Sequence, residues 1–197
     1  MARNIYGLDL GTYEIKVYDK KQDSTWKEKN VIAIVDGKEI LAVGDEAYAM
    51  FERTPGNIEV VFPMKEGVIS RFTDMQYLLQ NLLKKERRFA RGSEYLIAVP
   101  TDVTEVEKRA FFDLVVHSTA KAKEVSIVER GVAQCIGMGV DVRKTKGMLI
   151  ADFGAATTEL SVVGSGGMVL NKMLKIGGMT FDVAVQNMVR RNYDFMI

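Results

Sequence analysis

Two short motifs carry residue types that suit phosphate and metal binding. Asp9 and Gly11, and likewise Asp152 and Gly154, are separated by one apolar residue and follow an apolar run. Glycine in the turn after a strand lets backbone N–H groups approach a phosphate, because no Cβ blocks the way. The aspartate can hold a hydrated Mg²⁺ against the phosphates. One such motif is weak support for a site, but two in equivalent contexts predict turns that clamp a polyphosphate from both sides.

The elements that position these motifs alternate between strands and helices. Apolar runs bounded by turn residues predict the strands, and apolar residues at helical spacing predict the helices. Each motif ends one strand and precedes a second, which indicates a duplicated unit that opens each of two domains. Strands are predicted over residues 5–10, 15–19, 31–35, 40–43, 95–99, 125–128, 148–153, 157–163 and 168–175, and helices over 74–86, from Thr104, over 130–138 and from 180.

Two local signals fix element ends. Asp36-Gly37 lies between two strand-like runs and predicts a tight hairpin. Thr104 followed by Glu107 is a capping box, which predicts that a helix opens at this point.

Composition places the chain among ordinary mixed domains. With 197 residues it is at the border between one large domain and two small ones, and 47% apolar residues suffice for a core. A formal net charge of +1 gives no reason to expect nucleic acid as a partner. The single cysteine, Cys135, cannot form an internal disulfide and fits a reducing cytoplasm.

A resemblance to a known family emerges from several stretches in order along the chain. Residues 5–12 resemble the first phosphate motif of the superfamily of actin, sugar kinases and heat-shock chaperones. Other stretches are similar to the MreB/Mbl family of bacterial actins. They are residues 53–57 (Arg-Thr-Pro-Gly-Asn), 63–69 (Pro-Met-Lys-Glu-Gly-Val-Ile), 99–100 with 104–109, and 176–178 (Ile-Gly-Gly). The sequence is thereby identified as resembling the N-terminal part of such a protein.

The resemblance implies an α/β fold of the ribonuclease-H-like, actin-type ATPase class. Subdomains IA and IB would be complete, whereas IIA and IIB would be truncated, so we expect a fragment of a longer protein. The implied boundaries are 1–29 and 68–143 for IA, 30–67 for IB, 144–178 for the start of IIA and 179–197 for the start of IIB.

The same resemblance implies a nucleotide site for ATP or GTP with Mg²⁺. Asp9 and Asp152 would organise the metal ion through water. Lys16 would meet a phosphate, although as a strand residue it is equally expected to face solvent. The residues expected around the phosphates are Gly11, Thr12 and Tyr13 on one side, and Gly154, Ala155, Ala156, Gly177 and Gly178 on the other.

Some residues depart from the family pattern within the phosphate turns. Tyr13 and Glu14 are unfavourable beside phosphates, the first by its bulk and the second by its charge. Ala155 and Ala156 stand where the family has glycines, which adds methyl groups at the point of closest approach.

The sharpest departure lies at Arg130, where the family has the glutamate that positions the attacking water. A guanidinium stays protonated and cannot act as a general base, although it can pair with a terminal phosphate. Glu129 is one residue away and is a doubtful substitute. Our hypothesis is that hydrolysis is slow or lost while nucleotide binding persists. The alternative is that Arg130 is a surface residue and the motif is shifted by one position.

Residues 84–91 form a local basic cluster with five basic residues against one acid. Phe89 between Arg88 and Arg91 suits an anionic membrane surface, to which each basic residue contributes about 1 kcal/mol. An equally weighted interpretation is a helix C-terminus whose macrodipole is complemented by cations.

The sequence therefore predicts a nucleotide-binding filament subunit that acts in rod cell shape. Its partners would be itself, other MreB-type proteins and wall-synthesis membrane proteins, and it would lie in the cytoplasm at the inner face of the cell membrane. The rival hypothesis is a nucleotide-independent scaffold or regulator that copolymerises with a true MreB, favoured by the altered turns and Arg130. A sugar kinase is disfavoured by residues 53–69.

Overall fold

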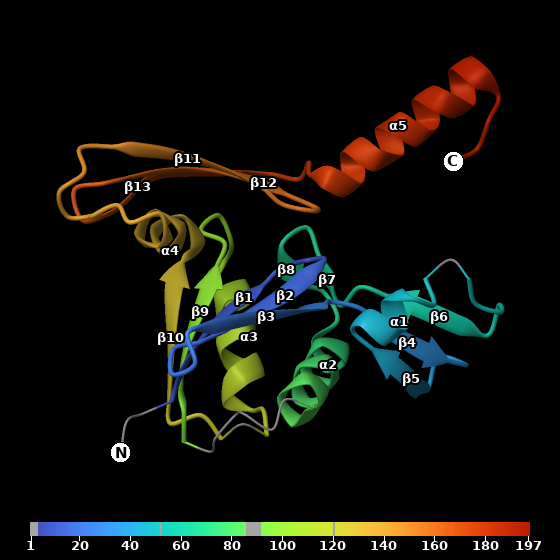
Figure 1. Cartoon of the computed structure of the whole chain (residues 1–197), viewed down its shortest axis with the longest axis horizontal. Coiled ribbons are helices and arrows are strands. Elements are labelled where there is room, and N and C mark those ends of the chain that lie inside the picture. The colour runs from blue at the N-terminus through green and yellow to red at the C-terminus, as the bar shows by residue number, and fades with distance from the viewer. Residues whose placement is uncertain (1–3, 52, 86–91, 120) are drawn as a thin grey trace. The chain divides into compact units, whose positions relative to one another are not determined.

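The computed structural model describes residues 4–51, 53–85, 92–119 and 121–197 (Figure 1). The chain forms two compact units. Unit 1 consists of Met1–Val99 and Val103–Arg130, and unit 2 of Pro100–Asp102 and Gly131–Ile197.

Unit 1 is built on a five-stranded sheet with the strand order β10-β9-β1-β2-β3. The strand β1 pairs antiparallel with β2 and parallel with β9, which in turn pairs parallel with β10. Alternate residues of β1 are buried because side chains along a strand point to opposite faces. The bounds are β1 (Ile5–Leu10), β2 (Glu14–Asp19), β3 (Ser24–Lys29), β9 (Glu94–Val99) and β10 (Glu124–Glu129).

Two helices, α2 (Phe72–Lys85) and α3 (Glu105–Val116), pack their apolar residues into the core of this sheet. The predicted capping box of α3 is confirmed: the Thr104 hydroxyl accepts from the Glu107 N–H at 3.2 Å, and the Glu107 carboxylate accepts from the Thr104 N–H at 2.7 Å.

A smaller sheet, with the order β5-β4-β6, has its own apolar core. The predicted hairpin between β4 and β5 is confirmed, and Asp36 and Gly37 at its turn both have positive φ, 51° and 66°. Its elements are β4 (Ile32–Val35), β5 (Glu39–Val43), α1 (Asp45–Tyr48) and β6 (Ile58–Val61), followed by the short pair β7 (Met64–Lys65) and β8 (Val68–Ile69).

Unit 2 contains an antiparallel sheet with the order β11-β12-β13. Cys135, Val142, Ile150 and Val163 form its small core. The helix α5 has no buried residue. The bounds are α4 (Arg130–Gly137, whose first residue ends unit 1), β11 (Met148–Phe153), β12 (Thr158–Gly164), β13 (Gly167–Leu174) and α5 (Gly178–Tyr193).

Within the described part of the chain, none of the helices combines the length and the apolar character that crossing a bilayer requires.

Candidate functional site

The first predicted phosphate turn is the hairpin between β1 and β2. Its Gly11 N–H donates to the Glu14 carbonyl at 3.2 Å. A Cβ added at Gly11 would lie 2.7 Å from that carbonyl oxygen, so no side chain fits at this position. The tight turn thus depends on the glycine that the sequence motif supplies.

The turn is fastened from outside by Asn30 and by the β7–β8 turn. The Asn30 side-chain amide donates to the Gly11 carbonyl at 2.8 Å, and its backbone N–H donates to the Tyr13 carbonyl at 2.9 Å. The Gly67 N–H donates to the Thr12 hydroxyl at 3.2 Å. Because carbonyl oxygens repel phosphate, directing two of them to Asn30 favours an anion beside this turn. Sequence reasoning missed Asn30, since nothing local marks its role.

The Tyr13 side chain contacts residues of α1, of β3 and of the segment after β6. Its hydroxyl donates to the Tyr48 hydroxyl at 2.6 Å, and its ring stacks on Phe62 with a centroid distance of 6.2 Å. The Lys29 ammonium lies 4.1 Å from the centroid of the same ring. These contacts fix the Tyr13 ring against other side chains. The bulk of the ring is therefore no longer an argument against phosphate binding at this turn.

The charge of Glu14 is offset by two lysines of β3. Its carboxylate oxygens lie 3.7 Å from the Lys27 ammonium and 3.8 Å from that of Lys29. Such partly exposed pairs stabilise a fold by only about 0–1 kcal/mol, but they lower the negative potential near the turn. The electrostatic objection to Glu14 is weakened accordingly.

Asp9 lies between two cations. Its Oδ2 is 3.3 Å from the Lys16 ammonium, and its Oδ1 is 3.5 Å from Nη2 of Arg130. The Arg130 side chain is 11% exposed. This low exposure argues against a surface position for Arg130, while the alternative of a motif shifted by one position stays a prediction. Lys16 is half-exposed and paired with Asp9.

This arrangement does not fit a magnesium ion at Asp9. Two unit charges 4 Å apart interact by about 4 kcal/mol at an effective dielectric constant of 20, and repulsion between a divalent ion and a guanidinium is about twice that. The guanidinium cannot relieve the repulsion by losing its proton. Among the residues that the structure describes, no group of three or more His, Cys, Asp or Glu side chains is placed to hold a metal ion.

The second predicted phosphate turn, between β11 and β12, lies in unit 2. Its Gly154 N–H donates to the Thr157 carbonyl at 2.8 Å. The Gly178 N–H donates to the Gly154 carbonyl at 3.0 Å, and the Met179 N–H donates to the Ala155 carbonyl at 2.8 Å. The structure thus brings the predicted residues Gly154, Ala155, Gly177 and Gly178 together, and the start of α5 closes this turn.

Asp152 accepts a hydrogen bond that sequence reasoning missed. The Gln134 side-chain amide donates to Asp152 Oδ2 at 2.7 Å. Gln134 lies one helical turn after Arg130 on α4, so the two polar side chains share one face of the helix. This spacing could have identified Gln134 from the sequence. A neutral amide leaves the charge of Asp152 in place, in contrast to the two cations around Asp9.

The predicted site residues are divided between the two units. Unit 1 holds Asp9, Lys16, Arg130 and the first turn. Unit 2 holds Asp152 and the second turn with Ala156, Gly177 and Gly178. Glu129 ends β10 opposite Val99 and is half-buried. That the two turns face each other stays a prediction. Arg88, Phe89 and Arg91 lie outside the described residues.

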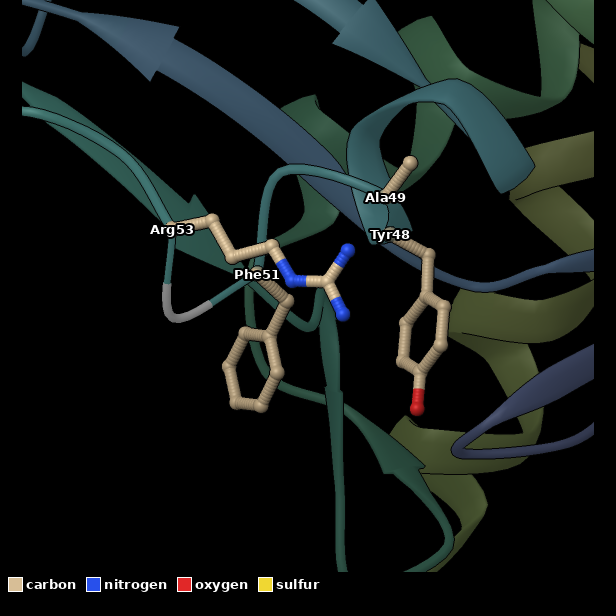
Figure 2. Close-up of a pocket in the computed structure, with 4 residues that line it drawn as sticks. All are labelled: Tyr48, Ala49, Phe51 and Arg53. Atoms are coloured by element: carbon tan, nitrogen blue, oxygen red, sulfur yellow. The ribbon is translucent and has the colours of Figure 1, made fainter.

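A pocket of 380 Å³ lies beside the first turn within unit 1. It is lined by Tyr48, Ala49, Phe51 and Arg53, and Figure 2 shows the Arg53 side chain extending toward the two aromatic side chains. Tyr48 also bonds the Tyr13 hydroxyl, so the pocket and the turn share one aromatic cluster.

Comparisons with known proteins bear on the fold and the family of the chain. The cell shape-determining protein MreB of Escherichia coli (strain K12) is 38% identical over 205 residues, which cover 100% of this chain and 58% of that protein. MreB5 of Spiroplasma citri, solved bound to ADP, matches with a TM-score of 0.90 at 29% identity and covers 100% of this chain and 59% of its own. A MamK double helical filament shares the fold at 20% identity with a TM-score of 0.79, covering 98% and 60%.

These likenesses confirm the predicted fold class, an α/β fold of the actin-like ATPase type. The chain spans 58% of the length of the Escherichia coli relative. A family model described as MreB/Mbl protein matches residues 3–197, and the chain belongs to this family of bacterial actin-like proteins.

Proposed function

We propose that this chain binds an adenine nucleotide at its two hairpin turns and acts as a filament subunit in the control of cell shape. The observation that carries the proposal is the geometry of the first turn. Gly11 has no room for a Cβ, and the Gly11 and Tyr13 carbonyls accept hydrogen bonds from Asn30. Structures of MreB5 of Spiroplasma citri bound to ADP and to AMPPNP support the choice of adenine over guanine nucleotides. The curated MreB and Mbl relatives support the role in cell shape.

Isothermal titration of ATP into the purified protein tests nucleotide binding. We expect saturable binding by the wild type and weaker binding by Asn30→Ala, because the released Gly11 carbonyl would turn toward the phosphates. A matched control is Asn57→Ala, whose side chain is exposed. Absence of heat with ATP, ADP and AMPPNP would contradict the proposal.

We propose in addition that hydrolysis is impaired. Arg130 is tied to Asp9 and stays protonated, so it cannot accept a proton from an attacking water. A phosphate-release assay should give a turnover far below that of a typical MreB. Turnover at the ordinary rate that Glu129→Ala abolishes would contradict this and would make Glu129 the catalytic residue.

The rival function, a nucleotide-independent scaffold that copolymerises with a true MreB, is favoured by one observation. Asp9, which the family resemblance assigns to metal binding, is occupied by Arg130 and Lys16. Electron microscopy with and without nucleotide separates the two functions. Filaments that form equally well under both conditions, together with no ATP binding, support the rival.

A position at the inner face of the cell membrane is also part of the proposal. It is supported by the basic and aromatic composition of residues 84–91. Liposome co-sedimentation of the wild type and Phe89→Ser tests it. Reduced pelleting of the variant with anionic vesicles is expected, whereas equal pelleting supports the interpretation as a helix end complemented by cations.

A further inference from the structure

We propose that Arg130 and Lys16 form a built-in cation site that replaces the magnesium ion at Asp9, so that this chain binds nucleotide without a divalent metal. The inference rests on the proposed nucleotide binding and names the ligand as a metal-free nucleoside polyphosphate. Three groups of unit 1 carry it, namely one carboxylate and the two cations on its two oxygens.

Both carboxylate oxygens of Asp9 face a cation. Its Oδ1 is buried, and the cation that it faces is the Arg130 guanidinium at 3.5 Å. Its Oδ2 faces the Lys16 ammonium at 3.3 Å. A hydrated Mg²⁺ would have to reach one of these oxygens, and both approaches lead to a positive charge.

Lys16 and Arg130 contribute two positive charges and Asp9 one negative charge, so the three side chains together carry +1. One Mg²⁺ bound to a single aspartate would also carry +1. The fixed cations therefore supply the positive charge that the phosphates would otherwise obtain from the metal ion.

Arginine carries several N–H donors in one plane, and it binds phosphate oxygens with charge-assisted hydrogen bonds. Arg130 begins α4 directly after β10, whose carboxyl end lies on the same side of the sheet as that of β1, because β1, β9 and β10 are parallel. Burial of its side chain, which is 11% exposed, holds the guanidinium at this position.

Titration of a fluorescent ATP analogue, with excess Mg²⁺ and with excess EDTA, tests the inference. For the wild type we expect dissociation constants that agree within about threefold under the two conditions. Arg130→Gln should weaken binding in EDTA by at least about tenfold and leave binding in Mg²⁺ less affected. Arg130→Lys keeps the charge but loses the planar set of donors, so its binding in EDTA should lie between that of the wild type and that of Arg130→Gln.

A second measurement guards against a variant that fails to fold. The melting temperature without nucleotide should be the same for the wild type in Mg²⁺ and in EDTA, whereas Arg130→Gln should gain stability from Mg²⁺ as Asp9 becomes open to the metal. Arg109→Gln is the matched control, because Arg109 is an exposed arginine of α3 that pairs with Asp113.

The outcomes separate the inference from the proposed function. Wild-type binding that is lost in EDTA overturns the inference and leaves nucleotide binding intact. Wild-type melting that rises with Mg²⁺ alone, and does so in Arg109→Gln as well, also overturns it. No binding under either condition overturns the proposed function and the inference together.

Discussion

At the scale of single residues, the first turn depends on a few side chains that are far from it in sequence. Asn30 is fully buried and reaches across to the Gly11 carbonyl, while Arg130 reaches the Asp9 carboxylate at 3.5 Å. Arg130 and Asp9 come together because the parallel strands β1, β9 and β10 place their carboxyl ends at one edge of the sheet. A position expected to hold a general base carries instead a permanent positive charge.

Removal of the Asn30 side chain should destabilise the fold as well as weaken nucleotide binding. Asn30→Ala leaves the Gly11 carbonyl without its partner in a buried place, and such a loss costs about 1–3 kcal/mol. Urea unfolding followed by circular dichroism measures the change. A free energy of unfolding equal to that of Asn57→Ala would show that the hydrogen bond contributes nothing.

A methyl group at Gly177 should disturb the second turn. Its Cβ would lie 2.6 Å from the Gly154 carbonyl oxygen and 2.7 Å from the backbone of Ala155, so the backbone must move. We expect Gly177→Ala to lower the free energy of unfolding by about 1–3 kcal/mol. Gly137→Ala is the control, because a Cβ there meets nothing within 4 Å. Equal stability of the two variants would contradict the close approach.

At the scale of elements, the turn after β1 and the small sheet share an aromatic cluster. Tyr13 of the turn bonds Tyr48 at the end of α1 and stacks on Phe62. This contact joins the expected phosphate turn to the elements that follow β3. Tyr13, whose bulk appeared as an obstacle in the sequence, therefore packs between the turn of the five-stranded sheet and the elements next to the β5-β4-β6 sheet.

A double-mutant cycle measures that contact directly. Tyr13→Phe and Tyr48→Phe each remove one hydroxyl of the 2.6 Å pair, and we expect a coupling free energy of about 1 kcal/mol between them. Tyr13→Phe with Tyr77→Phe is the control pair, since Tyr77 is exposed on α2. Additive effects in the first cycle would show that the two hydroxyls do not interact.

The elements could be predicted from the sequence where local rules decide them. The hairpin at Asp36-Gly37 follows from residues that accept positive φ, and the start of α3 follows from the capping box at Thr104. The strand β3 was not predicted, because its residues are largely polar and it lies at the edge of the sheet, where no second neighbour requires apolar side chains.

The candidate site could be predicted only in part for a related reason. The motifs identified Asp9 and Gly11 because both lie within one hairpin. The pairing of Asp9 with Arg130 spans most of unit 1, and it depends on the order of β1, β9 and β10, which local patterns do not determine. The same limit explains why the Tyr13 ring appeared unfavourable: its partners follow much later in the chain.

At the scale of the whole molecule, the α5 helix exposes an apolar face. Phe181, Val185 and Met188 share helical spacing and are 50%, 49% and 51% exposed. A contiguous apolar surface of this kind is typical of an interaction site. We predict that copies of the chain associate through this face, as a filament subunit would require.

Substitution of all three α5 residues by serine should therefore reduce self-association. Sedimentation velocity over a range of concentrations should show larger species for the wild type and a monomer for the triple variant. Val106→Ser, at an exposed residue of α3, is the control and should resemble the wild type. Equal association of all three proteins would exclude α5 as the contact.

Our central proposal, which the positions of the two units do not test, is that the turn after β1 and the turn after β11 hold the phosphates of one nucleotide. A crystal structure of the protein grown with AMPPNP tests this most directly. We expect N–H groups of residues 11–13 and 154–156 to surround the phosphates, with Arg130 beside them and no metal ion on Asp9. Phosphates bound away from these turns, or a Mg²⁺ on Asp9 with Arg130 displaced, would contradict it.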